Sequence, residues 1–202
     1  MAIQELLVKN LKVSFLTPEK ELLAIRGISY ELNRDETLAV VGESGCGKTV
    51  SALSILRLLE EPPGKIVSGE IFFDGKDLLK MSKKELQTYR GKDIAMIFQD
   101  PMTSMNPVLT IGEQIIETLL RHTSCSRKEA MNKTLKLLDQ VEIPSPKEKL
   151  DQYPHQLSGG MRQRAMIAMA LSCDPRILIA DEPTTALDVL TQGQILYLLK
   201  KI

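Results

Sequence analysis

A stretch of eight residues, GESGCGKT at positions 42–49, constrains the fold of this chain more than any other feature. It follows an apolar run at residues 37–41 and opens a segment, residues 48–59, whose leucines recur at helical spacing. The stretch matches the pattern G-x-x-x-x-G-K-[ST], which requires a strand before it and a helix after it. We therefore predict a strand over residues 37–41, a loop over 42–47 and a helix over 48–59, where Pro62 and Pro63 end it.

The chemistry of this stretch, which we call the phosphate loop, suits a nucleotide triphosphate. Glycines let backbone N–H groups point toward phosphate oxygens, and the helix N-terminus adds a partial positive charge. Lys48 would reach the β- and γ-phosphates, and the Thr49 hydroxyl would coordinate Mg²⁺. The alternative is a glycine turn that caps a helix beside a surface lysine. The predicted binding residues are Gly42, Glu43, Ser44, Gly45, Cys46, Gly47, Lys48 and Thr49.

A second apolar run, at residues 177–180, ends in the carboxylates of Asp181 and Glu182. A strand that ends in acids places them at the carboxyl edge of a sheet, where bound phosphate lies. Asp181 would hold Mg²⁺, and Glu182 would act as a general base toward the attacking water. Strands also end in acidic turn residues for structural reasons alone, so this interpretation depends on the phosphate loop.

A third motif, LSGGM at residues 157–161, precedes an apolar helical segment. The hydroxyl of Ser158 and the amides of Gly159 and Gly160 would lie at the positive end of this helix and form a second anion site. One triphosphate does not require two such sites in one chain. A helix N-cap without a ligand is the structural alternative.

The three motifs in this order resemble the ABC ATPase family, whose LSGGQ-type signature completes the nucleotide site of a partner chain in a head-to-tail dimer. Met161 stands here where glutamine is commonest. The run LSGGMRQR, with QDPMTSMNPVLTIGEQI at residues 99–115 and YPHQLSGG at 153–160, is similar to the oligopeptide, dipeptide and nickel importer branch. The resemblance covers the chain from about Leu6 to its last residue.

The resemblance assigns roles to three further residues. Phe15 would stack on adenine; the alternative is an ordinary aromatic strand residue. Gln99 would contact Mg²⁺ or the lytic water and link the core to a helical insert; the alternative is an exposed glutamine before a turn. Asp188 would cross the dimer interface as the residue of the D-loop. The alternative is a purely structural role, as an acidic residue at the N-terminus of a helix.

The predicted fold class is α/β, a P-loop NTPase core with an N-terminal antiparallel β subdomain and an inserted α-helical subdomain. Capping boxes at Ser82 with Glu85 and at Ser126 with Glu129 mark two helix starts. The predicted domains are residues 1–100 (core and β subdomain), 101–157 (helical subdomain) and 158–202 (signature helix, acidic strand and an incomplete end of the core). Predicted strands lie at 6–15, 25–32, 69–74, 94–98 and 177–180, and predicted helices at 111–122 and 126–141.

The resemblance also implies that the sequence is truncated at its C-terminus. In the family a further core strand, inserted between the phosphate-loop strand and the acidic strand, and a switch histidine follow the D-loop that contains Asp188. His122 and His155 both precede the acidic strand and cannot replace that histidine. We expect the 202 residues alone to unfold more readily and turn over more slowly than a version extended through the next strand.

The amino-acid composition limits the classes of molecule that this chain is expected to bind. Acidic and basic residues number 26 each, so no positive field favours nucleic acid. Apolar runs are too short to span a membrane, and three scattered cysteines indicate neither a disulfide framework nor a zinc site. By resemblance, the expected cofactors are ATP and Mg²⁺. The expected partners are a second ATP-binding subunit, two membrane permease subunits and, indirectly, a solute-binding protein, at the cytoplasmic face of the membrane.

The favoured function is ATP hydrolysis coupled to import of an oligopeptide, dipeptide or nickel. A soluble ABC ATPase of translation or DNA repair is the alternative within the family. It is disfavoured because such proteins usually carry paired cassettes or long coiled-coil inserts, and because the charge balance lacks a nucleic-acid footprint. A nucleotide-binding fragment without turnover is the alternative from another class.

Overall fold

The computed structural model describes residues 4–185 and 187–201, and the chain divides into two compact units, residues 1–87 and 88–202. Each unit is built around its own strands. The predicted domains, residues 1–100, 101–157 and 158–202, were drawn from the positions of the sequence motifs. The two compact units are defined by contacts within the chain, so they do not test that division, which stays a prediction.

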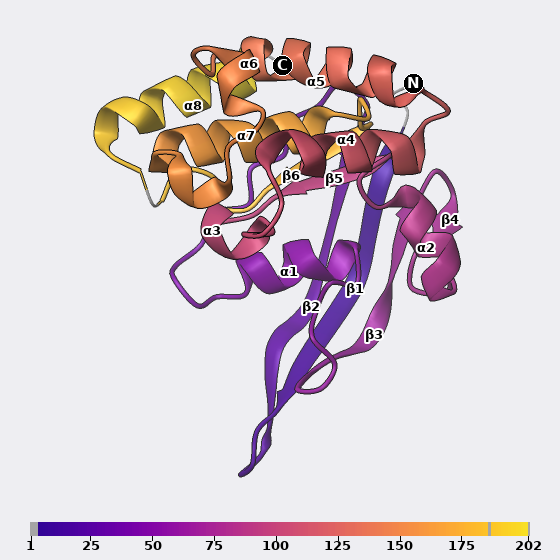
Figure 1. Cartoon of the computed structure of the whole chain (residues 1–202). Helices are drawn as coiled ribbons and strands as arrows, with labels where there is room; N and C mark the ends of the chain where they lie inside the picture. Colours follow the sequence, from indigo (N-terminus) through magenta and orange to yellow (C-terminus); the bar gives the residue numbers. More distant parts are fainter. Residues whose placement is uncertain (1–3, 186, 202) are drawn as a thin grey trace. The chain divides into compact units, whose positions relative to one another are not determined.

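The first unit is an antiparallel sheet with a helix (Figure 1). The strand order is β2-β1-β3-β4, so the N-terminal strand lies inside the sheet. The prediction of an N-terminal antiparallel β subdomain is thereby confirmed. The elements are β1 (Gln4–Leu16), β2 (Glu21–Asn33), α1 (Lys48–Ile55), β3 (Gly64–Phe73) and β4 (Lys76–Asp77), and α2 (Lys83–Tyr89) follows across the boundary between the units.

The core of this sheet depends on a bulge in β1. Val8 lies opposite Ile71 of β3, and both side chains are fully buried. Simple alternation would turn Leu11 to the other face of the sheet. The pairing shifts between Val8 and Leu11, where Asn10 adopts a φ of 45°, and this shift returns Leu11 and Val13 to the buried set.

The predicted strand at residues 37–41 is wrong: no described residue in this run belongs to a strand. Its side chains are turned to solvent, with Leu38 41 %, Val40 54 % and Val41 88 % exposed. An apolar run becomes a strand only when a neighbouring strand pairs with its backbone groups. The four strands of this unit pair among themselves, and none of them pairs with residues 37–41.

The predicted helix at residues 48–59 is shorter than expected. It ends at Ile55, and Arg57 adopts a left-handed φ of 49°. Such a residue stops the helical ladder before the prolines are reached. The guanidinium of Arg57 donates to the carbonyl of Met81 at 2.6 Å, which gives this early end a tertiary partner.

The second unit combines two parallel strands with a set of helices (Figure 1). Ile94 lies opposite Ile177 and Ile97 opposite Ala180, so both strands end at the same edge. The elements are β5 (Ile94–Ile97), α3 (Pro101–Ser104), α4 (Ile111–His122), α5 (Arg127–Gln140), α6 (Pro146–Lys149), the 3₁₀ turn η1 (Pro154–Gln156), α7 (Gly159–Leu171), β6 (Ile177–Ala180) and α8 (Val189–Lys201).

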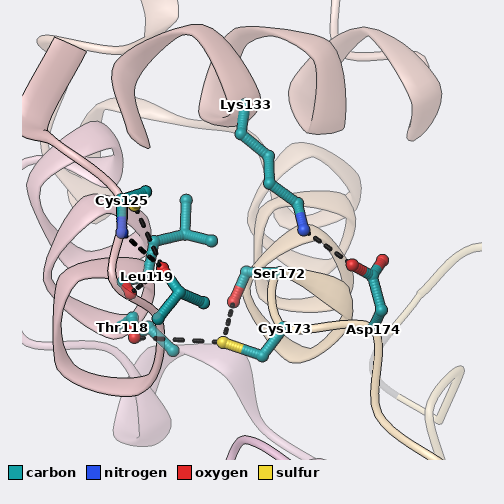
Figure 2. Close-up of polar contacts among 8 residues, drawn as sticks. Thr118, Leu119, Cys125, Lys133, Ser172, Cys173 and Asp174 are labelled. Carbon is teal, nitrogen blue, oxygen red and sulfur yellow. Dashed lines mark hydrogen bonds and ion pairs between the residues drawn. The ribbon is translucent and has the colours of Figure 1, made fainter. Parts of the chain in front are cut away.

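Side-chain contacts attach α4 and α5 to the end of α7, as Figure 2 shows. The thiol of Cys173 lies 3.9 Å from the carbonyl oxygen of Thr118 on α4, to which it donates. The ammonium of Lys133 on α5 pairs with the Asp174 carboxylate at 2.7 Å. Beneath these contacts the buried faces of α4, α5 and α7 form one apolar core.

The helix starts follow the predicted capping chemistry. At α5, Ser126 accepts from the Glu129 amide, and the Glu129 carboxylate accepts from the Ser126 amide at 2.7 Å. Hydrogen bonds from the Ser126 hydroxyl and amide lower the pKa of Glu129. The reciprocal hydrogen bonds of Ser82 with Glu85 are also present, and a further capping box, Thr110 with Glu113, opens α4, where the sequence analysis had not predicted one.

We predict that Glu129→Gln makes the thermal unfolding of the chain less sensitive to acid. The folded pKa of Glu129 lies below its ordinary value of 4.5, so its stabilising contribution is present above that value and is lost as pH falls through the folded pKa. The difference in melting temperature between wild type and variant should therefore shrink below about pH 4.5. Glu117→Gln, at an exposed position in the middle of α4, is the control. An equal pH trend in both variants would contradict the capping role.

Candidate functional site

The phosphate loop has the backbone geometry that its glycines predict. Gly45 and Gly47 adopt φ values of 78° and 101°, which glycine tolerates best. A Cβ added at Gly42 would lie 2.5 Å from the sulfur of Cys46, so a side chain there would require the Cys46 thiol to move. Gly47 is the N-cap of α1 and gives the helix no side-chain cap. The loop thus has glycines in the conformations that a phosphate-binding backbone requires.

The ammonium of Lys48 lies over its own loop. Its Nζ donates to the carbonyl oxygens of Gly42 at 2.9 Å and Glu43 at 3.0 Å. These bonds hold the cation next to the loop amides. The positive charge, the left-handed glycines and the helix N-terminus together fit the phosphates of a nucleotide.

A cavity of about 550 Å³ lies next to the phosphate loop in the first unit. This volume is in the range of ligand pockets, and six of its twelve lining residues are aliphatic. Phe15, the residue expected to stack on adenine, is not in the lining; it lies on β1 opposite Leu22 and Gly64. The lining residues are Leu23, Ala24, Ile25, Arg26, Ile28, Val40, Val41, Gly45, Cys46, Gly47, Lys48 and Ser51.

The acidic strand end lies in the second unit, together with Gln99. The Asp181 amide donates to the Ile97 carbonyl at 3.0 Å, and Asp181 is 7 % exposed. Glu182 turns the chain with a φ of 43°, and its Oε2 accepts from Gln99 Nε2 at 3.0 Å and from Thr185 Oγ1 at 3.2 Å. Since β5 and β6 are parallel, the residues that follow them meet at one edge. The structure therefore brings together Gln99 and Glu182, which are 83 positions apart in the sequence.

The signature, residues 157–161, starts α7. Ser158 is the N-cap and accepts from the amide of Met161 at 3.3 Å. A Cβ on Gly159 would lie 3.9 Å from Leu187, and one on Gly160 would lie 2.8 Å from Cγ2 of Thr191. The segment that contains Asp188 therefore packs directly on the signature glycines.

Asp188 has a capping role that the sequence alternative had anticipated. Its carboxylate accepts from the hydroxyl of Thr191 at 2.7 Å and from the amide of Thr191 at 3.0 Å. The hydrogen bond from the Thr191 hydroxyl, and to a lesser extent the one from its amide, lower the pKa of Asp188. Thr191, which touches Gly160 and Asp188 at once, was missed in the sequence analysis; the spacing D-x-x-T at a helix start is the signal that could have identified it.

The candidate residues fall into two groups. The phosphate loop and Phe15 belong to the first unit, and Gln99, Asp181, Glu182, the signature and Asp188 belong to the second. Their roles toward a nucleotide and Mg²⁺ stay predictions. Within the part of the chain that the structure describes, we find no helix long and apolar enough to cross a membrane.

Comparison with known proteins gives a family match and close relatives. The profile of the family described as "ABC transporter" matches residues 25–185. The dipeptide transport ATP-binding protein DppD of Bacillus subtilis (strain 168) is 57 % identical over 195 residues, which are 96 % of this chain and 58 % of that protein. The oligopeptide transport ATP-binding protein OppD of the same strain is 53 % identical over 96 % of this chain and 54 % of its own length. The chain thus spans little more than half the length of these relatives.

Solved structures agree with the fold. An ATP-binding cassette in a dimeric, post-hydrolysis state bound to ADP and Pi has a TM-score of 0.86 and 30 % identity, covering 97 % of this chain and 82 % of that one. The cbiO1 protein of Clostridium perfringens, part of the ABC transporter complex cbiONQ, has a TM-score of 0.75 and 26 % identity over 98 % of this chain and 73 % of that one. These similarities confirm the predicted α/β fold class.

Proposed function

Because the chain belongs to the ABC transporter family, we propose that it binds and hydrolyses ATP to drive import of an oligopeptide, a dipeptide or nickel. Peptides are the favoured cargo, since the relatives named for dipeptide and oligopeptide transport share more than half of the aligned residues with this chain. The observation that carries the proposal is the hydrogen bond between Gln99 and Glu182 at the common end of two parallel strands.

The phosphate loop is proposed to bind the triphosphate. Its backbone amides and the ammonium of Lys48 would hold the β- and γ-phosphate oxygens, so the carbonyls of Gly42 and Glu43 would share Lys48 with the nucleotide. The proposed Mg²⁺ ligands are Thr49, Asp181 and Gln99, and the ion would neutralise charge on the phosphates. Adenine stacking by Phe15 belongs to the same proposal.

Glu182 is the proposed general base. Gln99 and Thr185 both donate to the same oxygen, Oε2, and so fix the orientation of the carboxylate. An oriented carboxylate can take a proton from a water that attacks the γ-phosphate. The backbone of Glu182 is left-handed, with a φ of 43°, and such strained residues cluster at functional sites.

The proposed assembly is a head-to-tail dimer in which Ser158, Gly159 and Gly160 complete the nucleotide site of the partner chain, with Asp188 at the interface. The dimeric state of the related cassette with ADP and Pi supports it. Two permease subunits would dock near Gln99 and residues 101–157, on the cytoplasmic face of the membrane, and a solute-binding protein would act through them. No nucleic-acid partner is expected.

Mixing two inactive variants of the full-length protein tests this scheme. Ser158→Arg puts bulk into the partner's site, and Lys48→Ala disables its own loop, so each homodimer should lose phosphate release by about a hundredfold or more. A head-to-tail heterodimer of the two confines both defects to one site and leaves one intact. We therefore predict that mixing restores turnover.

Two controls sharpen the mixing experiment. A chain with both substitutions, mixed with wild type, forms heterodimers with two damaged sites and should show no such restoration. Ser158→Ala removes only the N-cap hydroxyl, and separates loss of the cap from the effect of bulk. Failure of the mixture to recover any activity, while wild type hydrolyses ATP, would count against the head-to-tail arrangement.

A further inference from the structure

The helix that starts at the signature carries a buried arginine to which the proposed chemistry gives no role. Arg164 is 7 % exposed, and it lies within a run of α7, residues 163–168, whose members are all buried. A charged side chain in such a place needs partners for its N–H groups, because an unpaired buried charge is costly. The partners of Arg164 therefore identify the segments that it holds.

One guanidinium joins three segments of the second unit. Its Nη1 donates to the carbonyl oxygen of Val141 at 2.7 Å and to Oε2 of Glu142 at 3.0 Å. Val141 is the C-cap of α5, and Glu142 continues the chain with a left-handed φ of 58°. The Nη2 of Arg164 donates to Oε1 of Gln194, on α8, at 3.0 Å. Arg164 thus ties the end of α5 to α8 through α7.

Besides the apolar packing of Ile195 and Leu198 of α8 in the core shared with α7, we consider two contacts between particular atoms of these helices, and the hydrogen bond between Arg164 and Gln194 is the second. The first is the packing of Gly160 on Thr191, where an added Cβ would come within 2.8 Å of a methyl carbon. Gly160 and Arg164 are four residues apart on α7, and Thr191 and Gln194 are three apart on α8, so each pair lies on one face of its helix. Two contacts one turn apart fix the relative orientation of the helices as well as their distance.

The orientation of α8 in turn sets the position of Asp188. The hydroxyl and amide of Thr191 both donate to the Asp188 carboxylate. Thr191 also rests on Gly160, which belongs to the signature. A rotation of α8 about this contact would move Asp188 relative to Ser158, the N-cap of α7.

We propose that Arg164 is a positioning residue, which couples the C-terminal end of α5 to Asp188 and to the signature glycines. The inference rests on the proposed function, in which those groups act on the partner chain's nucleotide. Without the guanidinium, α8 would keep the Gly160 contact and the apolar packing of Ile195 and Leu198 but would lose its hydrogen-bonded link to the end of α5. Displacement of the α5 end would then no longer reach Asp188. Substitution of such a positioning residue should lower the rate of turnover. It should leave nucleotide binding at the phosphate loop, which belongs to the other unit, unchanged.

The test is steady-state phosphate release by the full-length protein over a range of ATP concentrations. Gln194→Leu removes only the α8 acceptor, and we expect kcat to fall about tenfold or more while KM for ATP stays within about twofold. Gln194→Glu keeps an acceptor for Nη2 and should retain kcat to within about threefold. Arg164→Met should lower kcat at least as far as Gln194→Leu, and adding Gln194→Leu to it should cause no further loss.

A matched control uses a different polar contact of α5, with a residue that follows α7. Lys133→Met removes the ion pair with Asp174, which is shown in Figure 2 and does not reach α8. It should leave kcat unchanged. Wild-type kcat in a folded Gln194→Leu protein, or equal losses in Gln194→Leu and Lys133→Met, would overturn the proposal. Absence of turnover in the wild type would instead refute the proposed function itself.

Discussion

Lys48→Ala is expected to abolish tight Mg-ATP binding. The ammonium is the cation that the phosphate loop itself supplies, and in the free chain it already lies against the loop carbonyls of Gly42 and Glu43. Charge-assisted hydrogen bonds to phosphate are among the strongest polar contacts, so affinity should fall by about a hundredfold or more. Titration calorimetry with Mg-ATP measures the change directly.

Lys65→Ala provides the control for Lys48→Ala. Lys65 is exposed on β3, in the same unit, so its removal changes the net charge equally and leaves the loop intact. ATP affinity should then stay close to that of the wild type. If a folded Lys48→Ala chain binds Mg-ATP as tightly as wild type, the assignment of residues 42–49 as a phosphate loop is wrong.

Glu182→Gln is expected to separate binding from turnover in the full-length protein. Glutamine keeps the shape of the side chain and an oxygen that can accept from Gln99, but it cannot take a proton. Turnover should fall by about a hundredfold to ten-thousandfold, while ATP affinity is retained. Because ATP is no longer hydrolysed, the dimer that forms with bound ATP should persist. Sedimentation should therefore show dimers in the presence of ATP and monomers in the presence of ADP.

Thr185→Val is the partner measurement for Glu182→Gln. It removes the donor Thr185 Oγ1 from Oε2 and leaves the carboxylate in place, so its loss of turnover should be much smaller. Equal losses would mean that the region tolerates no change, whatever its chemistry. A Glu182→Gln protein that stays monomeric with ATP and hydrolyses it at the wild-type rate would contradict both the base and the dimer.

The elements that were predicted well from the sequence are determined by residues within the element itself. The capping box of Ser126 and Glu129 is complete within four residues, and α5 begins there. The alternation of Leu6 with Val8, and of Leu11 with Val13, likewise indicates a strand, whereas the bulge at Asn10 that brings both pairs to the buried face was found only in the structure. At the candidate site, the pattern located Gln99 and Glu182 but not the hydrogen bond between them.

The elements that sequence predicted poorly depend on partners elsewhere in the chain. The run at residues 37–41 has the composition of a buried strand, yet composition supplies no neighbour for its backbone. The early end of α1 depends on the backbone of Arg57, whose side chain is held by Met81. Arg164 reads in the sequence as one more charge on a helix, because its three acceptors lie 22 to 30 positions away.

The left-handed backbone of Glu182 gives this position an evolutionary meaning. Glycine would occupy such a conformation with less strain, so a glutamate there is kept against the local conformational preference. As the proposed general base, Glu182 would be held there by selection for turnover, since selection for folding alone would favour its replacement. In a lineage released from the need to hydrolyse ATP, this is the position where drift should begin.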